Sequence, residues 1–110
     1  MKVEVFFSSA CSHRDRTLEI VDEAIAQSGA AADRDVVLVA DYEDAKARRC
    51  FGSPTVRVDG VDVEYAEREP EEFTTGCRYY NNPEGWVPYP RKELVLRGIQ
   101  AAARRAQARA

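Results

Sequence analysis

An Asp-Gly pair between two runs of alternating valines is the feature that most limits what this chain can fold into. The pair is Asp59-Gly60, and it separates residues 55–58 from residues 61–64. An Asp-Gly loop suits a hairpin because both positions accept the positive φ that a tight turn between twisted strands requires. The pattern therefore predicts a β-hairpin whose strands are antiparallel neighbours.

The chain before the hairpin changes its apolar spacing twice. Apolar side chains alternate over residues 3–7, as in a strand, and then recur every three or four positions from about residue 12 to residue 27. The second spacing is typical of an amphipathic helix, and Gly29 suits its left-handed end. Residues 36–40 are continuously apolar, which predicts a strand buried on both faces of a parallel sheet. Strand, helix and strand together predict a right-handed crossover.

Two more helices are expected. Residues 43–50 favour a short helix that ends before Gly52 and Pro54. After Pro90, apolar residues at helical spacing over residues 94–106 define a final helix. The arginines at the end of this helix either favour the negative pole of its dipole or dock a partner. They are Arg104, Arg105 and Arg109.

The segment 65–90 separates the hairpin from the last helix and is rich in Pro, Glu, Asn and Gly. It also holds several aromatic side chains, so we expect an ordered loop that packs onto the domain. These aromatic residues either line a substrate groove or cover an exposed sheet edge. They are Tyr79, Tyr80, Trp86 and Tyr89.

These segments predict a single α/β domain over residues 1–110. The expected element order is β-α-β-α-β-β-α, with a mixed four-stranded sheet and helices on both faces. A chain of 110 residues with 45% hydrophobic and 32% charged residues has the length and composition of one globular core.

Charge and hydropathy disfavour several functions. The formal net charge is -3, which is unsuited to gripping a nucleic-acid backbone. No apolar run approaches the ~18 residues of a membrane span, and the acidic, alternating amino terminus differs from a secretory signal, so we expect a cytoplasmic protein. The charge is uneven, with seven acids and one arginine over residues 59–72 and six basic residues and one acid over residues 91–110.

The three cysteines carry the most distinctive chemistry of the chain. They are Cys11, Cys50 and Cys77, and their odd number and wide spacing fit neither a disulfide framework nor a zinc ribbon. Any function that they have is therefore that of thiols. Cys50 ends the short helix next to Phe51 and is expected to fill the core.

Cys11 follows the first strand at the start of the first helix, where open α/β sheets present ligands and reactive groups. The positive pole of the helix and the nearby His13, Arg14 and Arg16 favour the thiolate form, which is the nucleophile. A small buried residue at a tight junction is the alternative. Because the residues around it are mostly polar, we expect a reactive thiol.

Two strings of residues make the chain resemble the thioredoxin-like superfamily, in particular its small bacterial monothiol or glutaredoxin-like proteins. Cys11-Ser12-His13-Arg14 follows the first strand, and Phe51-Gly52-Ser53-Pro54-Thr55-Val56 precedes the hairpin. In that superfamily the motif cysteine opens the first helix, and a cis proline before the third strand packs beside it. The resemblance implies that Pro54 is this proline, and that Ser53, Pro54 and Thr55 flank the backbone of a bound partner.

The chain departs from the CxxC pattern of that superfamily, because Arg14 stands where the second cysteine would be. A dithiol switch within the motif is therefore excluded, although a mixed disulfide on Cys11 is not. Arg14 either holds charge near the thiolate, meets an anionic partner such as a glutathione carboxylate, or is a solvated arginine. The resemblance also implies that His13 stabilises the thiolate, with a solvated histidine as the alternative.

Cys77 is the candidate second thiol. Gly76 permits a sharp turn before it and Arg78 adds a cation after it. The small proteins that this chain resembles commonly carry a Cys-Arg-x-Tyr string at this place. Cys77 would then approach Cys11 as a resolving thiol or as a second ligand to a soft metal, and a cysteine buried among tyrosines is the alternative.

The sequence therefore predicts a thioredoxin-like thiol–disulfide oxidoreductase with Cys11, His13, Arg14 and Cys77 as its catalytic residues. Its partners would be protein thiols or glutathione, with no cofactor, resident metal, nucleic acid or membrane. The alternative is a binding module without turnover, in which Cys11 and Cys77 capture a protein or a thiophilic metal such as Cu(I), Hg(II) or Zn(II). A scaffold with inert thiols is the third interpretation.

Overall fold

The hairpin predicted from Asp59-Gly60 forms in the computed structural model, which describes residues 1–9, 11–66, 70 and 72–109. Asp59 has a φ of 50° and Gly60 a φ of 82°, so both turn residues adopt the positive φ expected of them. The two strands pair in antiparallel register on either side of this turn.

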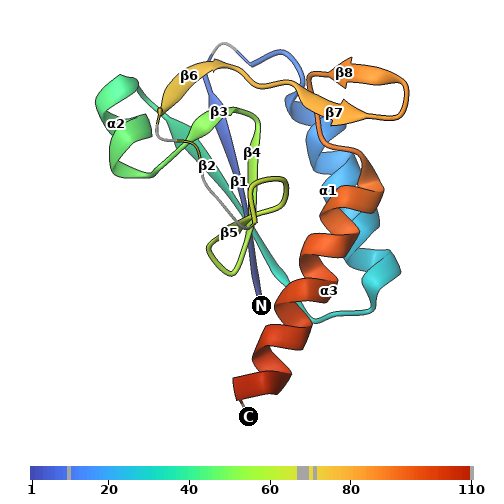
Figure 1. The fold of residues 1–110 in the computed structure, drawn as a ribbon. Helices are drawn as coiled ribbons and strands as arrows, with labels where there is room; N and C mark the ends of the chain where they lie inside the picture. Colours follow the sequence, from blue (N-terminus) through green and yellow to red (C-terminus); the bar gives the residue numbers. More distant parts are fainter. Residues whose placement is uncertain (10, 67–69, 71, 110) are drawn as a thin grey trace.

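The hairpin belongs to a longer series of elements than the sequence suggested (Figure 1). The described elements are β1 (Lys2–Ser8), α1 (Arg14–Ser28), β2 (Asp33–Val39), α2 (Tyr42–Ala47), β3 (Phe51–Ser53), β4 (Thr55–Val58), β5 (Val61–Asp62), β6 (Thr74–Cys77), β7 (Tyr80–Asn82), β8 (Gly85–Val87) and α3 (Lys92–Arg109).

The main sheet has four strands in the order β2-β1-β4-β5. β1 pairs in parallel with β2 and in antiparallel register with β4, so the sheet is mixed. The described residues therefore form a mixed α/β fold with a four-stranded mixed sheet and three helices, as predicted. Within the part of the chain that the structure describes, no helix combines the length and apolar character that a membrane crossing needs.

The alternation of β1 sends its side chains into two separate cores. Val3, Val5 and Phe7 are fully buried in a cluster that also contains residues of α1 and α3. Phe6 points to the other face, where it packs in a smaller cluster with Ala45 of α2. Figure 1 accordingly shows α1 and α3 together on one side of the sheet and α2 on the other. The first strand thus determines which helix covers which face.

The prediction for the second strand was wrong, because β2 is an edge strand rather than a strand buried on both faces. Val36 is 40% exposed and Leu38 is 52% exposed. Their partners on β1, Val5 and Phe7, are fully buried, so the helical cover on this face ends at β1. A continuous apolar run has the same sequence signature at the centre of a sheet and at an edge with partial cover.

The prediction of a loop over residues 65–90 also needs correction, because this segment contains β6, β7 and β8. β6 pairs in parallel with β3, and β7 and β8 form a small hairpin. The aromatic residues divide between two roles: Tyr80 is buried in the main core, whereas Tyr79 and Trp86 are exposed. Short strands interrupted by Pro, Gly and Asn do not show enough alternation to be recognised from sequence.

Candidate functional site

Cys11 lies in the loop that connects β1 to α1. Its backbone N–H donates to the carbonyl of Ser8 at 3.1 Å, which closes a turn directly after the strand. The residue is partly buried and packs at the margin of the main core. Cys11 is therefore held by a defined turn while part of its surface stays accessible to solvent.

The first helix begins later than the sequence pattern predicted. α1 starts at Arg14 with His13 as its N-cap residue, so Cys11 precedes the first helical turn instead of opening it. The His13 carbonyl accepts bonds from both the backbone N–H and the Oγ1 hydroxyl of Thr17, at 3.1 and 2.7 Å. Gly29 ends the helix in the left-handed conformation, as predicted.

Aromatic rings support the charged residues next to Cys11. The Arg14 guanidinium carbon lies 5.4 Å from the centroid of the Phe7 ring, within the range of a cation–π contact. The imidazole of His13 lies 6.0 Å from the ring centroid of Tyr89, and the Arg16 guanidinium lies 5.9 Å from the same ring. These contacts position His13, Arg14 and Arg16 around the start of α1.

The segment before β4 lies beside the turn that contains Cys11. The Ser53–Pro54 peptide bond is cis, and Ser53, Pro54 and Thr55 are all buried. The Ser53 hydroxyl oxygen accepts the backbone N–H of Ser8 at 3.0 Å. The Thr55 hydroxyl donates to the Gly52 carbonyl at 2.6 Å. The side chains of Ser53 and Thr55 therefore bond inside the domain, and Ser8 connects this segment to Cys11.

Cys77 lies beside the same segment on β6, the strand that pairs with β3. It lies at the end of β6 in register with Ser53 and is exposed. The Ser53 carbonyl accepts the backbone N–H of Arg78 at 3.0 Å. Ser53 is consequently the shared neighbour of both candidate thiol segments, since its hydroxyl contacts the turn of Cys11 and its carbonyl contacts the strand of Cys77.

The prediction that Arg78 offers a cation to Cys77 is corrected by its ion pairs. The Arg78 side chain is 3% exposed and donates from Nη1 and Nη2 to the two carboxylate oxygens of Asp62, at 2.7 and 2.8 Å. Glu64 lies 3.5 Å from Nη2. Burial disfavours the charged guanidinium, but the hydrogen bonds and charge of Asp62, together with Tyr80 and Glu64, outweigh burial and raise the pKa of Arg78. The cation is thus neutralised inside the domain.

Two tyrosines enclose the guanidinium of Arg78. Its carbon lies 4.7 Å from the ring centroid of Tyr65 and 4.4 Å from that of Tyr80. The sequence does not predict this cluster, because Asp62 and Arg78 are 16 positions apart and the place of Arg78 after Cys77 suggests a cation for that thiol instead. The seven acids over residues 59–72 include, in Asp62, a buried structural carboxylate that is only 1% exposed.

Tyr80 connects this cluster to the segment before β4 through a hydrogen bond. Its hydroxyl donates to the Pro54 carbonyl at 2.6 Å, and its side chain is fully buried. Burial raises the pKa of Tyr80 well above its ordinary value, against the opposing effect of the Arg78 charge. The folded protein therefore keeps Tyr80 protonated under conditions in which an unfolded tyrosine ionises.

This shift predicts a loss of stability at alkaline pH. Because the pKa of Tyr80 is higher in the folded state, its contribution to stability is complete below the unfolded value of about 10 and declines as pH rises above it. We expect Tyr80→Phe to cost about 1–3 kcal/mol at neutral pH, since the buried Pro54 carbonyl loses its donor. Urea unfolding at several pH values measures both effects, and identical pH profiles for wild type and Tyr80→Phe would contradict the assignment.

Cys50 lies in the core, as predicted. Its thiol is buried, with Sγ 3.3 Å from the Gly52 carbonyl oxygen and 3.5 Å from Oγ1 of Thr55. It packs in the smaller cluster beneath α2. Cys50 is therefore unavailable to a partner in the folded protein.

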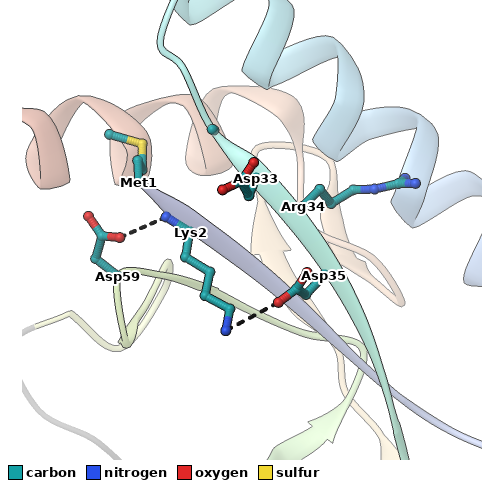
Figure 2. A pocket seen from close by; sticks show the side chains of 7 residues that line it. Met1, Lys2, Asp33, Arg34, Asp35 and Asp59 are labelled. Carbon is teal, nitrogen blue, oxygen red and sulfur yellow. Dashed lines mark hydrogen bonds and ion pairs between the residues drawn. The ribbon is translucent and has the colours of Figure 1, made fainter.

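A hollow of about 650 Å³ lies away from all of the thiols. Figure 2 shows it around the start of β1, with Asp33, Asp35 and Asp59 on its walls. The Lys2 ammonium lies 3.2 Å from Asp35, and the Lys2 backbone N–H donates to Asp59 at 2.8 Å. The hydrogen bond and charge of Asp35 raise the pKa of Lys2. Because β1 runs from Lys2 to Ser8, this hollow is at the opposite end of the strand from the turn of Cys11.

The described residues contain no group of three or more His, Cys, Asp and Glu side chains arranged to hold a metal ion. No family model, curated protein or solved structure matches the chain. The fold and the site define a small mixed α/β domain that presents one partly exposed thiol after its first strand and a second, exposed thiol at the end of β6.

Proposed function

We propose that this protein is a thioredoxin-like thiol–disulfide oxidoreductase that acts through Cys11. The observation that carries the proposal is the connection through Ser8: its carbonyl accepts the N–H of Cys11, and its own N–H donates to Ser53, directly before Pro54. A partly exposed thiol is thereby held beside a Ser-Pro-Thr segment. This arrangement supports the resemblance carried by the two sequence strings.

The proposed step is an exchange that conserves the number of disulfides. The Cys11 thiolate attacks one sulfur of a disulfide, a bond forms between Cys11 Sγ and that sulfur, and the other sulfur leaves as a thiolate that takes up a proton. Glutathione thiolate can then attack the sulfur of the bound group, form a disulfide with it and release Cys11 as a thiolate. Alternatively, Cys77 attacks Cys11 Sγ, releases the bound group as a thiol and leaves a Cys11–Cys77 disulfide, which two glutathione thiols reduce to two thiols and oxidised glutathione. Because Arg14 stands in the second motif position, the resolving thiol must come from outside the motif.

His13 and Arg14 supply the charge near the attacking sulfur in this proposal. His13 caps α1 and contacts Tyr89, while the exposed Arg14 lies over Phe7. They follow Cys11 by two and three positions, and a guanidinium there suits an anionic partner such as a glutathione carboxylate. The carbonyls of Ser53 and Pro54 each accept a bond inside the domain already, so this segment supports the site mainly through its shape.

The test is to locate and compare mixed disulfides with glutathione. Incubation with oxidised glutathione is expected to place one glutathionyl group on Cys11, as mass spectrometry of proteolytic fragments would show. Cys11→Ser should lower the glutathione-dependent reduction of a small disulfide to the rate of glutathione alone, because the attacking sulfur is lost. Cys77→Ser is the matched control, since it removes an exposed thiol from the neighbouring strand.

The two variants separate the possible outcomes. A disulfide between Cys11 and Cys77 that disappears in either variant assigns Cys77 as the resolving thiol, which requires their α-carbons to come within about 7 Å. Retained turnover in Cys77→Ser assigns that role to glutathione. Adduct formation confined to Cys77, or full turnover in Cys11→Ser, would refute the proposed function.

A further inference from the structure

A groove of about 430 Å³ lies between β5 and residues 94–105 of α3. Its floor is apolar, with Val61 and Val63 on one side and Leu94 and Ala101 on the other. Figure 1 shows the carboxyl end of α3 at the far end of the molecule from the loop between β1 and α1. The groove is therefore separate from the proposed thiol site.

Three arginines of α3 also line this groove. They are Arg97, Arg104 and Arg105. Arg97 and Arg104 are seven residues apart, about two helical turns, so they lie on one side of the helix. Arg97 and Arg104 are exposed and Arg105 is partly exposed. The helix thus presents a basic rim above an apolar floor.

The basic rim is not balanced by carboxylates in the described structure. None of the ion pairs between described residues involves Arg97, Arg104 or Arg105. Asp62 is the acidic side chain among the lining residues, and it is buried and paired with Arg78. The sequence has no acidic residue after Glu93. The described residues that line the groove consequently carry an excess of positive charge, although the formal net charge of the sequence is -3.

The close approach of α3 to the sheet shapes the groove. A β-carbon added to Gly98 would lie 2.9 Å from Cγ1 of Val63, so the helix backbone rests on the side chain next to β5. β5 is also an edge strand of the main sheet. The groove is therefore bounded by a sheet edge on one side and a helix on the other.

We propose that this groove binds an acidic segment of a partner protein. Carboxylates of that segment would pair with Arg97, Arg104 and Arg105, and its apolar side chains would lie on Val61, Val63 and Ala101. Arginine suits this role because its planar guanidinium binds carboxylates with two parallel hydrogen bonds. The apolar floor favours a peptide over a nucleic acid, since a phosphate backbone has no apolar groups to bury there.

The direct test is binding of a fluorescein-labelled peptide of alternating Glu and Leu, measured by fluorescence polarisation against the full chain. A peptide with Lys in place of Glu is the control ligand. We expect saturable binding of the Glu peptide that weakens as salt is raised, and no binding of the Lys peptide. Amide chemical shifts in NMR spectra should change along β5 and over residues 94–105 of α3.

Two charge reversals of equal size identify the surface that binds. Arg104→Glu should weaken binding of the Glu peptide about tenfold, whereas Arg16→Glu, an exposed arginine at the start of α1, should change it less than about twofold. Arg104→Lys should weaken binding less than Arg104→Glu does, because lysine keeps the charge but lacks the two parallel hydrogen bonds, and this separates charge from folding. Equal losses in both Glu variants would show that only net charge matters and would overturn the proposal.

Three other results would overturn the proposal as well. One is the absence of Glu-peptide binding at the highest soluble concentration of peptide. Another is tighter binding of single-stranded DNA of the same length than of the Glu peptide. A third is concentration-dependent self-association that Arg104→Glu abolishes, because the occupant would then be a second copy of this chain. None of these measurements depends on Cys11, so failure of the groove proposal can be distinguished from failure of the proposed thiol exchange.

Discussion

Arg78→Met is expected to lower the free energy of unfolding by about 3–5 kcal/mol, because it removes one partner of a buried ion pair and leaves the other charge uncompensated. The side chains of Arg78 and Asp62 are 3% and 0% exposed, so water cannot replace the lost bonds. The change would also remove the cation between the rings of Tyr65 and Tyr80. Urea unfolding followed by circular dichroism measures the loss.

Two further variants distinguish this mechanism from a general effect of removing an arginine. Arg48→Met breaks the exposed pair with Asp44 and should cost less than about 1 kcal/mol. Adding Asp62→Leu to Arg78→Met should recover part of the loss, because the stranded carboxylate is removed. Equal costs for Arg78→Met and Arg48→Met would show that the buried pair does not hold the domain together.

Gly52→Ala is the second substitution expected to have a large effect, because both its backbone and its surroundings oppose a side chain. Gly52 has a φ of 113° and is buried in β3. A β-carbon there would lie 2.8 Å from Cβ of Arg78 and 3.2 Å from the carbonyl oxygen of Gly76. Backbone strain of about 1–3 kcal/mol and overpacking of about 1–3 kcal/mol together predict a loss of about 2–6 kcal/mol.

Gly85→Ala provides the matched control for that substitution. Gly85 has a φ of 120°, but nothing lies within 4 Å of an added β-carbon. Its substitution should therefore cost only the backbone strain of about 1–3 kcal/mol. The difference between the two unfolding free energies isolates the contact between β3 and β6. A negligible difference would mean that β6 can move away from β3 without loss.

Gly52→Ala also reports on the arrangement of the thiols. The contact it disrupts lies in the strand pair that holds Cys77 beside Ser53. If this pairing positions Cys77 for exchange with Cys11, the variant should slow formation of a disulfide between them more than it slows glutathionylation of Cys11. Both rates can be followed by mass spectrometry after rapid alkylation.

Several parts of the fold could be predicted because short-range interactions decide them. Asp59 and Gly60 form the expected turn, and Gly29 ends α1 in the expected conformation. Asp41, which is not among the predicted features, caps α2 through the backbone N–H of Asp44 and is equally local. Each of these features depends on residues within a few positions of one another. The backbone preferences of Gly and the side-chain bonds of Asp act locally, whatever the rest of the chain does.

Other parts could not be predicted because they depend on residues that are distant in sequence. The helices α1 and α3 pack over β1 but leave Val36 and Leu38 of β2 exposed, so the exposure of these two residues depends on where the helices lie. Seven acidic residues lie between residues 59 and 72 of the sequence. Arg78 pairs with Asp62 because β5 brings this carboxylate to the guanidinium. The strand β6 exists because β3 offers it an edge.

The sequence by itself determined the order of the main elements, the hairpin turn, and the place of Cys11 directly after the first strand. Only the tertiary structure decided that Ser53 contacts both thiol segments, that Arg78 is neutralised by Asp62, and that the α3 arginines border an apolar groove. The first group depends on conformational preferences of a few consecutive residues. The second depends on which surfaces meet when the chain folds, as for Ser8 and Ser53, which lie 45 positions apart.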